Sequence, residues 1–271
     1  MRCRRCVAMG VILCAAMTAG AQTAEELVAK NLAAKGGIEK IKSITSLREI
    51  GKLDTSDQFT AIVSEERKSP EMLRQAFTLM GMSAVKAYDG STGWQISPFM
   101  GRKDPELMGE DALRGFLEEA DFYGPLVDYQ QKGNRIEYLG HATVDGDDAY
   151  RLKVTLKNGD FIYYFLDPDT YLEIRMEKNV FIRGSVRETV QNLGAYKQVA
   201  GVYFPFSLEV GPKNAPALDK ITITKIEANV SIPDTQFKMP AAPAKPSPQQ
   251  HPEPPTKEPA PKPPPPKPPG A

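Results

Sequence analysis

The feature that most constrains this chain is an alternation of apolar and polar side chains, with a period of two residues, between residues 47 and 230. Successive side chains of a β-strand point to opposite faces of a sheet, so this period predicts strands. Short runs of turn residues separate most of the segments, which favours an antiparallel meander. The expected strands cover residues 47–53, 59–68, 73–79, 83–89, 93–97, 135–139, 149–157, 161–166, 171–178, 185–193, 202–209 and 221–230.

A twisted open sheet of about eleven strands tends to curl, and two segments with helical spacing are available to cover its concave side. Thr23 is expected to cap the first helix, with Glu26 as its capping-box partner and Leu27 on its apolar face. Residues 98–133 interrupt the strands, and residues 110–120 within them are expected to form the second helix. The predicted fold class is therefore mainly β (α+β): one open antiparallel sheet with helices over one face.

The register of two neighbouring strands depends on the turn at Asn158 and Gly159. This pair is typical of a two-residue type I′ hairpin. Such a turn would place Leu156 opposite Phe161 and would continue outward in the same register. Opposed residues of a hairpin share one face of the sheet. The turn therefore predicts that the odd-numbered aromatic residues of 161–166 share a face with the even-numbered residues of 149–157.

A second turn leads to the same face. A four-residue loop at 167–170, with Pro168 at a favoured turn position, would pair Leu166 with Tyr171. Both registers together predict a face of nine apolar side chains: Leu152, Val154, Leu156, Phe161, Tyr163, Phe165, Leu172, Ile174 and Met176. The opposite face is mixed, and the long stems of its Lys and Arg side chains can cover its apolar residues.

The nine-residue face needs a cover, and the two helical segments can either close it as an ordinary core or leave a cleft. The sequence is compatible with both outcomes. Seven further side chains are expected to join the lining of such a cleft: Phe77, Leu79, Met80, Met82, Trp94, Phe116 and Phe122.

The two ends of the chain differ from this central part. Residues 1–21 combine three early arginines, a short apolar stretch and the small-residue sequence Ala19-Gly20-Ala21, which is typical of a cleaved secretory signal peptide. Cys14 would favour lipid attachment instead, but Leu13 stands where a small residue is required. The mature chain is therefore expected to begin near Gln22 and to be exported, without a later apolar run long enough for a transmembrane helix.

Residues 240–271 contain 15 prolines in 32 residues and no aromatic or aliphatic anchor, so we expect a disordered tail that acts either as a spacer or without a partner. The folded domain is thus expected at residues 22–239. The whole chain has 34 basic and 34 acidic residues, and loss of Arg2, Arg4 and Arg5 with the signal peptide would leave a net charge of −3. This weak charge gives no electrostatic case for binding nucleic acid.

The residues that usually carry catalysis are scarce. All three cysteines lie in the signal peptide, and the remainder contains two histidines, His141 and His251, of which the second lies in the tail. The acidic clusters at 145–148 and 167–173 lack the spacing of a calcium loop and suit turns between strands. We therefore predict no enzyme, no metal site and no cofactor, although paired carboxylates at the rim of a sheet leave a glycosidase as an alternative.

Several stretches resemble the LolA/LolB-like superfamily of outer membrane lipoprotein-sorting proteins. They are "LVAKNLAAKGGIEKIKSI", "AYDGSTGWQISPF", "VDGDDAYRLKVTLKNGDFIYYFLDPDTYLEIRMEKN" and "YKQVAGVYFPFSLEV", and the resemblance covers residues 24–239. It implies an unclosed, strongly curved half-barrel whose concave face is covered by helices and binds acyl chains. It also implies an arginine on the sheet that holds a closed state. Arg48, Arg74 and Arg135 all lie in expected strands, and the sequence does not choose among them.

Two functions follow from this resemblance. The first is a periplasmic carrier that binds lipoprotein acyl chains or lipid in an apolar groove and moves them toward the outer membrane, with an envelope exporter or receptor as a further partner. In it, residues 98–133 would act as a flap with hinges at Gly101, Gly109, Gly115 and Gly124. The alternative is a half-barrel sensor or protein-interaction module of the cell envelope without transport activity.

Overall fold

The computed structural model describes residues 22–182 and 184–241, so the predicted signal peptide and the predicted disordered tail beyond residue 241 lie outside the described residues. The helices are α1 (Ala24–Ala34), α2 (Ile38–Ser43) and α3 (Glu110–Ala120), with short 3₁₀ turns η1 (Pro98–Met100) and η2 (Asp234–Gln236). The strands are β1 (Ser46–Asp54), β2 (Thr60–Lys68), β3 (Met72–Leu79), β4 (Met82–Tyr88), β5 (Gly93–Ser97), β6 (Arg102–Leu107), β7 (Arg135–Val144), β8 (Asp147–Thr155), β9 (Phe161–Leu166), β10 (Glu173–Ile182), β11 (Ser185–Gly194), β12 (Lys197–Val199), β13 (Val202–Phe204), β14 (Ser207–Pro212) and β15 (Asp219–Ala228).

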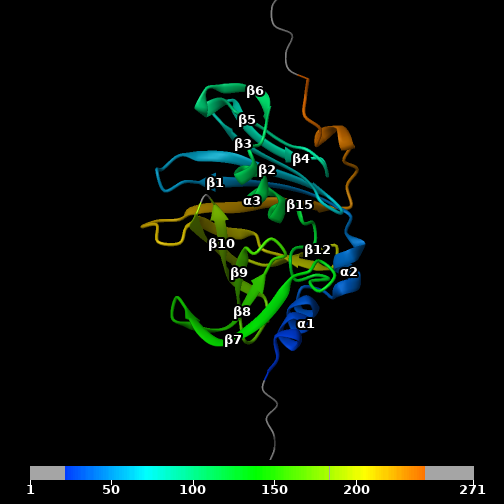
Figure 1. Ribbon diagram of the computed structural model, residues 1–271, viewed down its shortest axis with the longest axis vertical. Helices are drawn as coiled ribbons and strands as arrows, with labels where there is room; N and C mark the ends of the chain where they lie inside the picture. The colour runs from blue at the N-terminus through cyan, green and yellow to red at the C-terminus, as the bar shows by residue number, and fades with distance from the viewer. Residues whose placement is uncertain (1–21, 183, 242–271) are drawn as a thin grey trace, which may run out of the picture. The chain divides into compact units, whose positions relative to one another are not determined.

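Thirteen of these strands form one antiparallel sheet in the order β6-β5-β4-β3-β2-β1-β15-β14-β11-β10-β9-β8-β7, and β12 and β13 form a separate hairpin. β6 and β7 lie at opposite ends of the sheet and do not pair with each other, so the sheet is open (Figure 1). The prediction of a mainly β fold with one open antiparallel sheet and few helices is confirmed. No helix among the described residues is both long enough and apolar enough to cross a bilayer.

The strands differ from the prediction in two places. The interruption at 98–133 contains β6, which pairs with β5 and extends the sheet by one strand. The expected strand at 202–209 is divided into β13 and β14, which belong to different sheets. Pro205 lies at the division and has no backbone N–H to give to a ladder, so the strand cannot continue through it.

The predicted register of β8 and β9 is wrong by one residue. Leu156 N donates to Asp160 O at 2.8 Å and Gly159 N donates to Leu156 O at 2.9 Å, so the hairpin loop has three residues and ends on Gly159, with φ of 89°. This is a turn followed by a bulge, not a two-residue turn. Leu152 therefore lies opposite Tyr164, and a slip of one residue exchanges the faces of the whole strand.

The predicted register of β9 and β10 is also wrong. Leu166 pairs with Glu173 instead of Tyr171, and Tyr164 pairs with Met176. The loop is longer than expected because Tyr171 adopts a left-handed conformation, with φ of 59°. Asp167 stabilises the loop by accepting hydrogen bonds from the backbone N–H groups of Asp169 and Thr170 at 3.1 and 2.7 Å.

The predicted nine-residue face is consequently divided between the two faces of the sheet. The inner face, which α1 covers, holds Leu152, Val154, Ile162, Tyr164 and Leu166, with Leu156 and Met176 packed beside them. The outer face holds Phe161, Tyr163, Phe165 and Ile174. The prediction that charged stems cover the face of Ile162, Tyr164 and Leu166 is wrong, because α1 covers it. Charged groups lie over the rings of the outer face instead: Arg151 lies 4.1 Å from the ring centre of Tyr163 and Lys153 lies 4.9 Å from that of Phe161.

Helix α1 begins as the sequence predicts. Thr23 and Glu26 form the reciprocal capping box, with bonds of 3.1 and 3.2 Å, and Leu27 and Val28 enter the core against β8 and β9. α3 matches its predicted bounds and packs Phe116 and Ala120 on β3 and β4. α2, β13 and the segment after α3 form another core, which includes Ile41, Phe122 and Val202.

The corrected register makes a prediction about stability. Ile162→Ala should lower the free energy of unfolding by about 2–4 kcal/mol, because it opens a void in the buried core under α1. Tyr163→Ala, one residue further along and on the half-exposed outer face, should cost roughly 1–2 kcal/mol. Urea unfolding of both variants measures the difference. A larger loss for Tyr163→Ala would support the register that the turn sequence predicted.

Candidate functional site

A cavity of about 790 Å³ lies on the inner face of the sheet. Its floor is formed by β1 to β4 on one side and by β10, β11, β14 and β15 on the other, and its walls include α1, α2 and the end of α3. Much of its lining is aliphatic or aromatic: Leu32, Ile41, Ile44, Leu47, Val63, Phe77, Phe122, Tyr123, Leu126, Val127, Met176, Leu193, Val202, Phe204, Leu208, Val210, Ile221, Ile223 and Ile226. The helices therefore leave a cleft over part of the sheet and close a core over the rest.

The sixteen side chains predicted to bind lipid fall into several places. Phe77, Phe122 and Met176 line the cavity. Leu152, Val154, Leu156 and Phe116 belong to the cores under α1 and α3. Phe161, Tyr163, Phe165 and Ile174 lie on the outer face, and Leu172 is half-buried in the loop before β10.

The remaining four lie toward the β6 end of the sheet. Trp94 is buried, and its indole N–H donates to the carbonyl of Phe237 at 2.7 Å. Leu79, Met80 and Met82 lie at the β3–β4 turn, where Met80 is 91% exposed. Contact with lipid stays a prediction for all sixteen residues.

The cavity also contains a row of polar side chains that the sequence analysis did not select. Glu49 on β1 lies opposite Glu65 on β2, Glu65 opposite Gln75 on β3, and Gln75 opposite Lys86 on β4. All four line the cavity. The alternation of the predicted strands places Glu49 on the same face as Leu47. The alignment of Glu49, Glu65, Gln75 and Lys86 in one row depends on the registers of β1 to β4, which are set by turns that the sequence did not specify.

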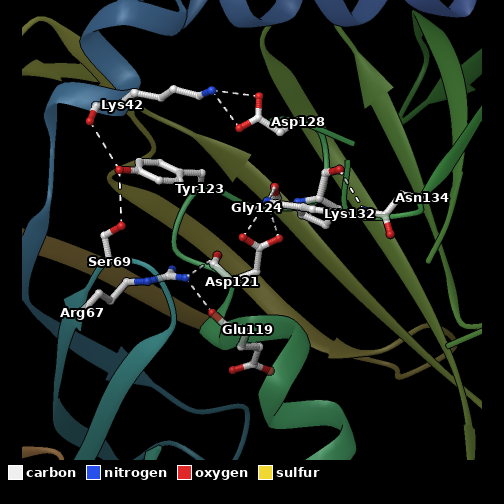
Figure 2. Close-up of polar contacts among 11 residues, drawn as sticks. Lys42, Arg67, Ser69, Glu119, Asp121, Tyr123, Gly124, Asp128, Lys132 and Asn134 are labelled. Carbon is white, nitrogen blue, oxygen red and sulfur yellow. Dashed lines mark hydrogen bonds and ion pairs between the residues drawn. The ribbon is translucent and has the colours of Figure 1, made fainter. Parts of the chain in front are cut away.

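Arg67 connects the floor of the cavity to its roof, which we define as residues 119–134. One guanidinium nitrogen donates to the carbonyls of Glu119 and Asp121 at 2.6 and 3.0 Å (Figure 2). Another donates to Glu65 at 3.3 Å. The guanidinium also lies 5.9 Å from the ring centre of Phe122. The arginine that joins the sheet to its cover is therefore Arg67. The candidates from the sequence were Arg48, Arg74 and Arg135, which did not include it.

A second basic residue fixes the shape of the roof. Lys132 donates to both carboxylate oxygens of Asp121 at 2.7 Å and to the carbonyl of Gly124 at 2.8 Å (Figure 2). Asn134 donates to the carbonyl of Pro125 at 3.1 Å. These bonds satisfy backbone carbonyls of a segment that has no regular structure, so the roof keeps its form above the cavity.

The roof is also joined to α2. Lys42 forms an ion pair of 2.8 Å with Asp128, and the Tyr123 hydroxyl donates to the carbonyl of Lys42 at 3.3 Å. Ser69, just after β2, donates to the same hydroxyl at 3.4 Å. Both Lys42 and Asp128 are partly exposed, so this end of the roof is held by weaker bonds than the Arg67 end.

Glu49 has an unusual electrostatic environment. The pKa of its carboxyl is raised to about 7: removal from water is the largest cause, the nearby charge of Glu65 adds to the rise, and Arg67 opposes it. Glu49 is half-buried because the cavity reaches it, yet protein surrounds it on the other sides. Among the described residues, its carboxyl group has no hydrogen-bond partner and no ion pair.

A separate polar cluster lies where α1 meets the cavity. Burial acts to raise the pKa of Glu173, but the charge and hydrogen bond of Lys35 at 3.0 Å hold it below its usual value. The Tyr196 hydroxyl donates to the Glu173 carbonyl at 2.7 Å, and Asn31 donates to the Tyr171 carbonyl at 2.8 Å. This cluster is well paired, apart from the carbonyl oxygen of the Asn31 side chain, and anchors α1 to β10.

No group of three or more His, Cys, Asp and Glu side chains in the described part of the chain has the geometry of a metal site. The acidic clusters take part in turns: Asp145 and Gly146 form the β7–β8 turn with positive φ angles of 53° and 104°.

Comparison with known proteins shows the fold. No family model matches the sequence, and no curated protein matches it. Among solved structures, a DUF1329 family protein from Desulfovibrio piger has a TM-score of 0.55 at 12% identity, covering 79% of this chain and 97% of that one. A LolA superfamily protein from Nitrosomonas europaea has a TM-score of 0.53 at 13% identity, covering 80% and 98%. The chain therefore shares the LolA fold that its sequence resembles.

The raised pKa of Glu49 predicts a pH-dependent effect of Glu49→Gln. In the unfolded chain the group ionises near 4.5, whereas in the folded state it ionises near 7, so ionisation opposes folding as pH rises between these values. We expect Glu49→Gln to stabilise the protein by roughly 1–2 kcal/mol at pH 8, a value discounted because solvent enters the cavity, and by less at pH 5.

Urea unfolding at the two pH values measures this difference. Glu137→Gln is the matched control, because Glu137 is exposed on β7. An equal gain at both pH values, or an equal gain in the control, would contradict the assignment.

Proposed function

We propose that this protein is a periplasmic carrier that binds the acyl chains of lipoproteins or lipids in the cavity and moves them toward the outer membrane. The observation that carries the proposal is the apolar lining of a cavity of about 790 Å³ on the inner face of the sheet. This volume is in the range of sites that enclose a small-molecule ligand. The shared fold with a LolA superfamily protein supports the same interpretation.

The energetic argument concerns the cargo. Each CH₂ group removed from water is worth about 0.8 kcal/mol, so a chain of roughly fifteen carbons costs on the order of 12 kcal/mol to expose. A protein that carries such a chain through an aqueous compartment must supply a dry surface for it. The side chains of Leu47, Ile223, Ile226 and Phe122 provide this surface between the sheet and the roof.

Release requires that the cover move. β6 belongs to the sheet, so the segment that can move is shorter than the predicted flap of residues 98–133 and consists of α3 and the roof. Its hinges would be Gly109, at the start of α3, and Gly124, inside the roof. Gly124 adopts a φ of 75°, which side-chain-bearing residues rarely adopt. Opening would break the bonds of Arg67 to the carbonyls of Glu119 and Asp121.

Export fits the proposed location. The predicted signal peptide at residues 1–21 would deliver the mature chain to the periplasm. An exporter that loads the cavity and a receptor that empties it are part of the same proposal.

Native mass spectrometry of residues 22–271, purified from a periplasm without detergent, tests carriage. We expect a bound lipid or acylated peptide, and we expect Val63→Trp to abolish it, because Val63 lines the cavity beside Phe77. Ile62→Trp is the matched control, because the adjacent side chain is 57% exposed on the other face. Circular dichroism confirms that both variants fold, since overpacking costs about 1–3 kcal/mol.

A clean unbound mass, without uptake of added lipid, would contradict carriage and favour the sensor or interaction module. Equal lipid loss in Val63→Trp and Ile62→Trp would place the bound lipid outside the cavity.

The role of the roof can be tested through Arg67→Met, which keeps the apolar stem and removes the hydrogen bonds to Glu119 and Asp121. A hydrogen bond to a charged group contributes about 1.5–3 kcal/mol, so hydrogen exchange of the roof amides should become faster by at least tenfold. Arg48→Met is the control, because Arg48 pairs with Glu66 on the outer face at 2.9 Å. Unchanged exchange in Arg67→Met would show that the other bonds suffice to hold the roof.

A further inference from the structure

The unpaired carboxyl group of Glu49 indicates what kind of ligand head group the cavity accepts. Its cross-strand neighbour Glu65 is already engaged: one oxygen accepts from Arg67 at 3.3 Å and the other from Gln75 at 2.9 Å. The carboxyl group of Glu49 has neither a hydrogen-bond donor nor a basic side chain as a partner among the described residues. Glu49 lines the cavity, so a ligand bound there can reach its carboxyl group.

The charges around the cavity do not balance. Six carboxylate and four basic side chains line it: Glu49, Glu65, Glu118, Glu119, Asp121 and Glu173 against Lys35, Arg67, Lys86 and Lys178. Three of the carboxylates are paired within the lining, in the ion pairs Lys35–Glu173, Lys178–Glu118 and Arg67–Glu65. Asp121 pairs with Lys132, and Glu119 accepts from Gln75 at 3.0 Å. Among the described residues, Glu49 and Glu119 are therefore the two lining carboxylates without a basic partner. Glu119 is exposed, so the unpaired carboxylate that is withdrawn from water is that of Glu49.

Neither nearby cation is placed to neutralise Glu49. Arg67 directs its terminal nitrogens at Glu65 and at two roof carbonyls, and its Nε is buried without an acceptor. Lys86 lies three strands away from β1 and is exposed. A carboxylate withdrawn from water without a compensating charge is unfavourable, and a cationic hydrogen-bond donor brought in by a ligand would relieve this cost.

We infer that the cavity selects amphiphiles that carry a protonated amine, with the ammonium group bound to the Glu49 carboxylate and the apolar chain held between the sheet and the roof. This inference rests on the proposed function. The surroundings of Glu49 suit such a molecule, because Ile226 lies opposite it on β15 and Val63 lies two residues from Glu65 on the same face of β2. The charged head and the first carbons of the chain would thus be accommodated side by side.

The same arrangement makes binding depend on pH. The polar groups that line the cavity around Glu49 are Glu65 and Arg67 on β2, Gln75 on β3 and Glu119 at the end of α3, with Lys86 further away on β4, while β15 presents the uncharged Ile226. Since the pKa of Glu49 is about 7, an ammonium ligand binds the ionised form that predominates above this value. Its affinity should rise by up to about tenfold between pH 6 and pH 8, and binding should release a proton.

Dodecylamine, dodecanol and dodecanoate form a matched set of probes, which titration calorimetry can compare on residues 22–271. The amine keeps its charge over this range, as a lysine does, with a pKa of about 10.4. At pH 8 we expect the amine to bind at least tenfold more tightly than the alcohol. This ratio should fall to about twofold in Glu49→Gln and remain at its original value in Glu137→Gln.

The outcomes separate this inference from the proposed function. Binding of the alcohol with no preference for the amine would overturn the inference and leave carriage intact, and so would a preference for dodecanoate. A preference for the amine that survives in Glu49→Gln would move the head-group site elsewhere and overturn it as well. Failure of all three probes to bind would contradict both proposals.

Two natural sources could supply the amine, and two further probes distinguish them. One is a single-chain phosphatidylethanolamine, and the other is a diacylglyceryl-cysteine peptide with a free amino terminus. Each is compared with its N-acetylated form. The source whose affinity falls at least tenfold on acetylation in the wild type, but not in Glu49→Gln, is the one that the site recognises, and equal affinity of all four compounds would overturn the inference.

Discussion

The pairing of β1 with β15 is the interaction on which the rest of the structure depends. It joins a strand from residues 46–54 to one from residues 219–228, and without it the sheet would separate into β6 to β1 and β15 to β7. The cavity draws its floor from both halves, so this pairing also creates the site. Gly51 lies at the bulge of this pair, where an added Cβ would lie 2.8 Å from the carbonyl of Thr222. A side chain at Gly51 would push the two halves apart.

The roof shows how an irregular segment can cover an apolar surface. Residues 121–134 contain no helix or strand, and buried carbonyls in such a segment need donors. The side chains of Arg67, Lys132 and Asn134 supply these donors, to the carbonyls of Asp121, Gly124 and Pro125 respectively. Since these contacts are few and specific, the cover is held without the cooperative ladder that stabilises the sheet, so it can open while the sheet remains folded.

Local patterns in the sequence predict the elements well but predict their alignment poorly. The capping box at Thr23 and the helix at 110–120 depend on neighbouring residues, and the period of two that predicts the strands is equally local. The faces of β8 and β9 depended on whether a turn has two or three residues, and the backbone angle of Gly159 decided this. The pairing of Glu49 with Glu65 and the reach of Arg67 to the roof needed a register and a tertiary contact, neither of which a period can provide.

The open edges of the sheet have a mechanical consequence. A closed barrel has a circumference set by its number of strands and their stagger, so its interior cannot widen without breaking hydrogen bonds between strands. Here β6 and β7 each have one neighbour in the sheet, and no ladder joins the two ends. The curvature can therefore change by small increments of twist spread over thirteen strands, with every ladder intact. The capacity of the cavity is thus set by how tightly the sheet is rolled, and cargoes of different girth can be accommodated by one backbone topology.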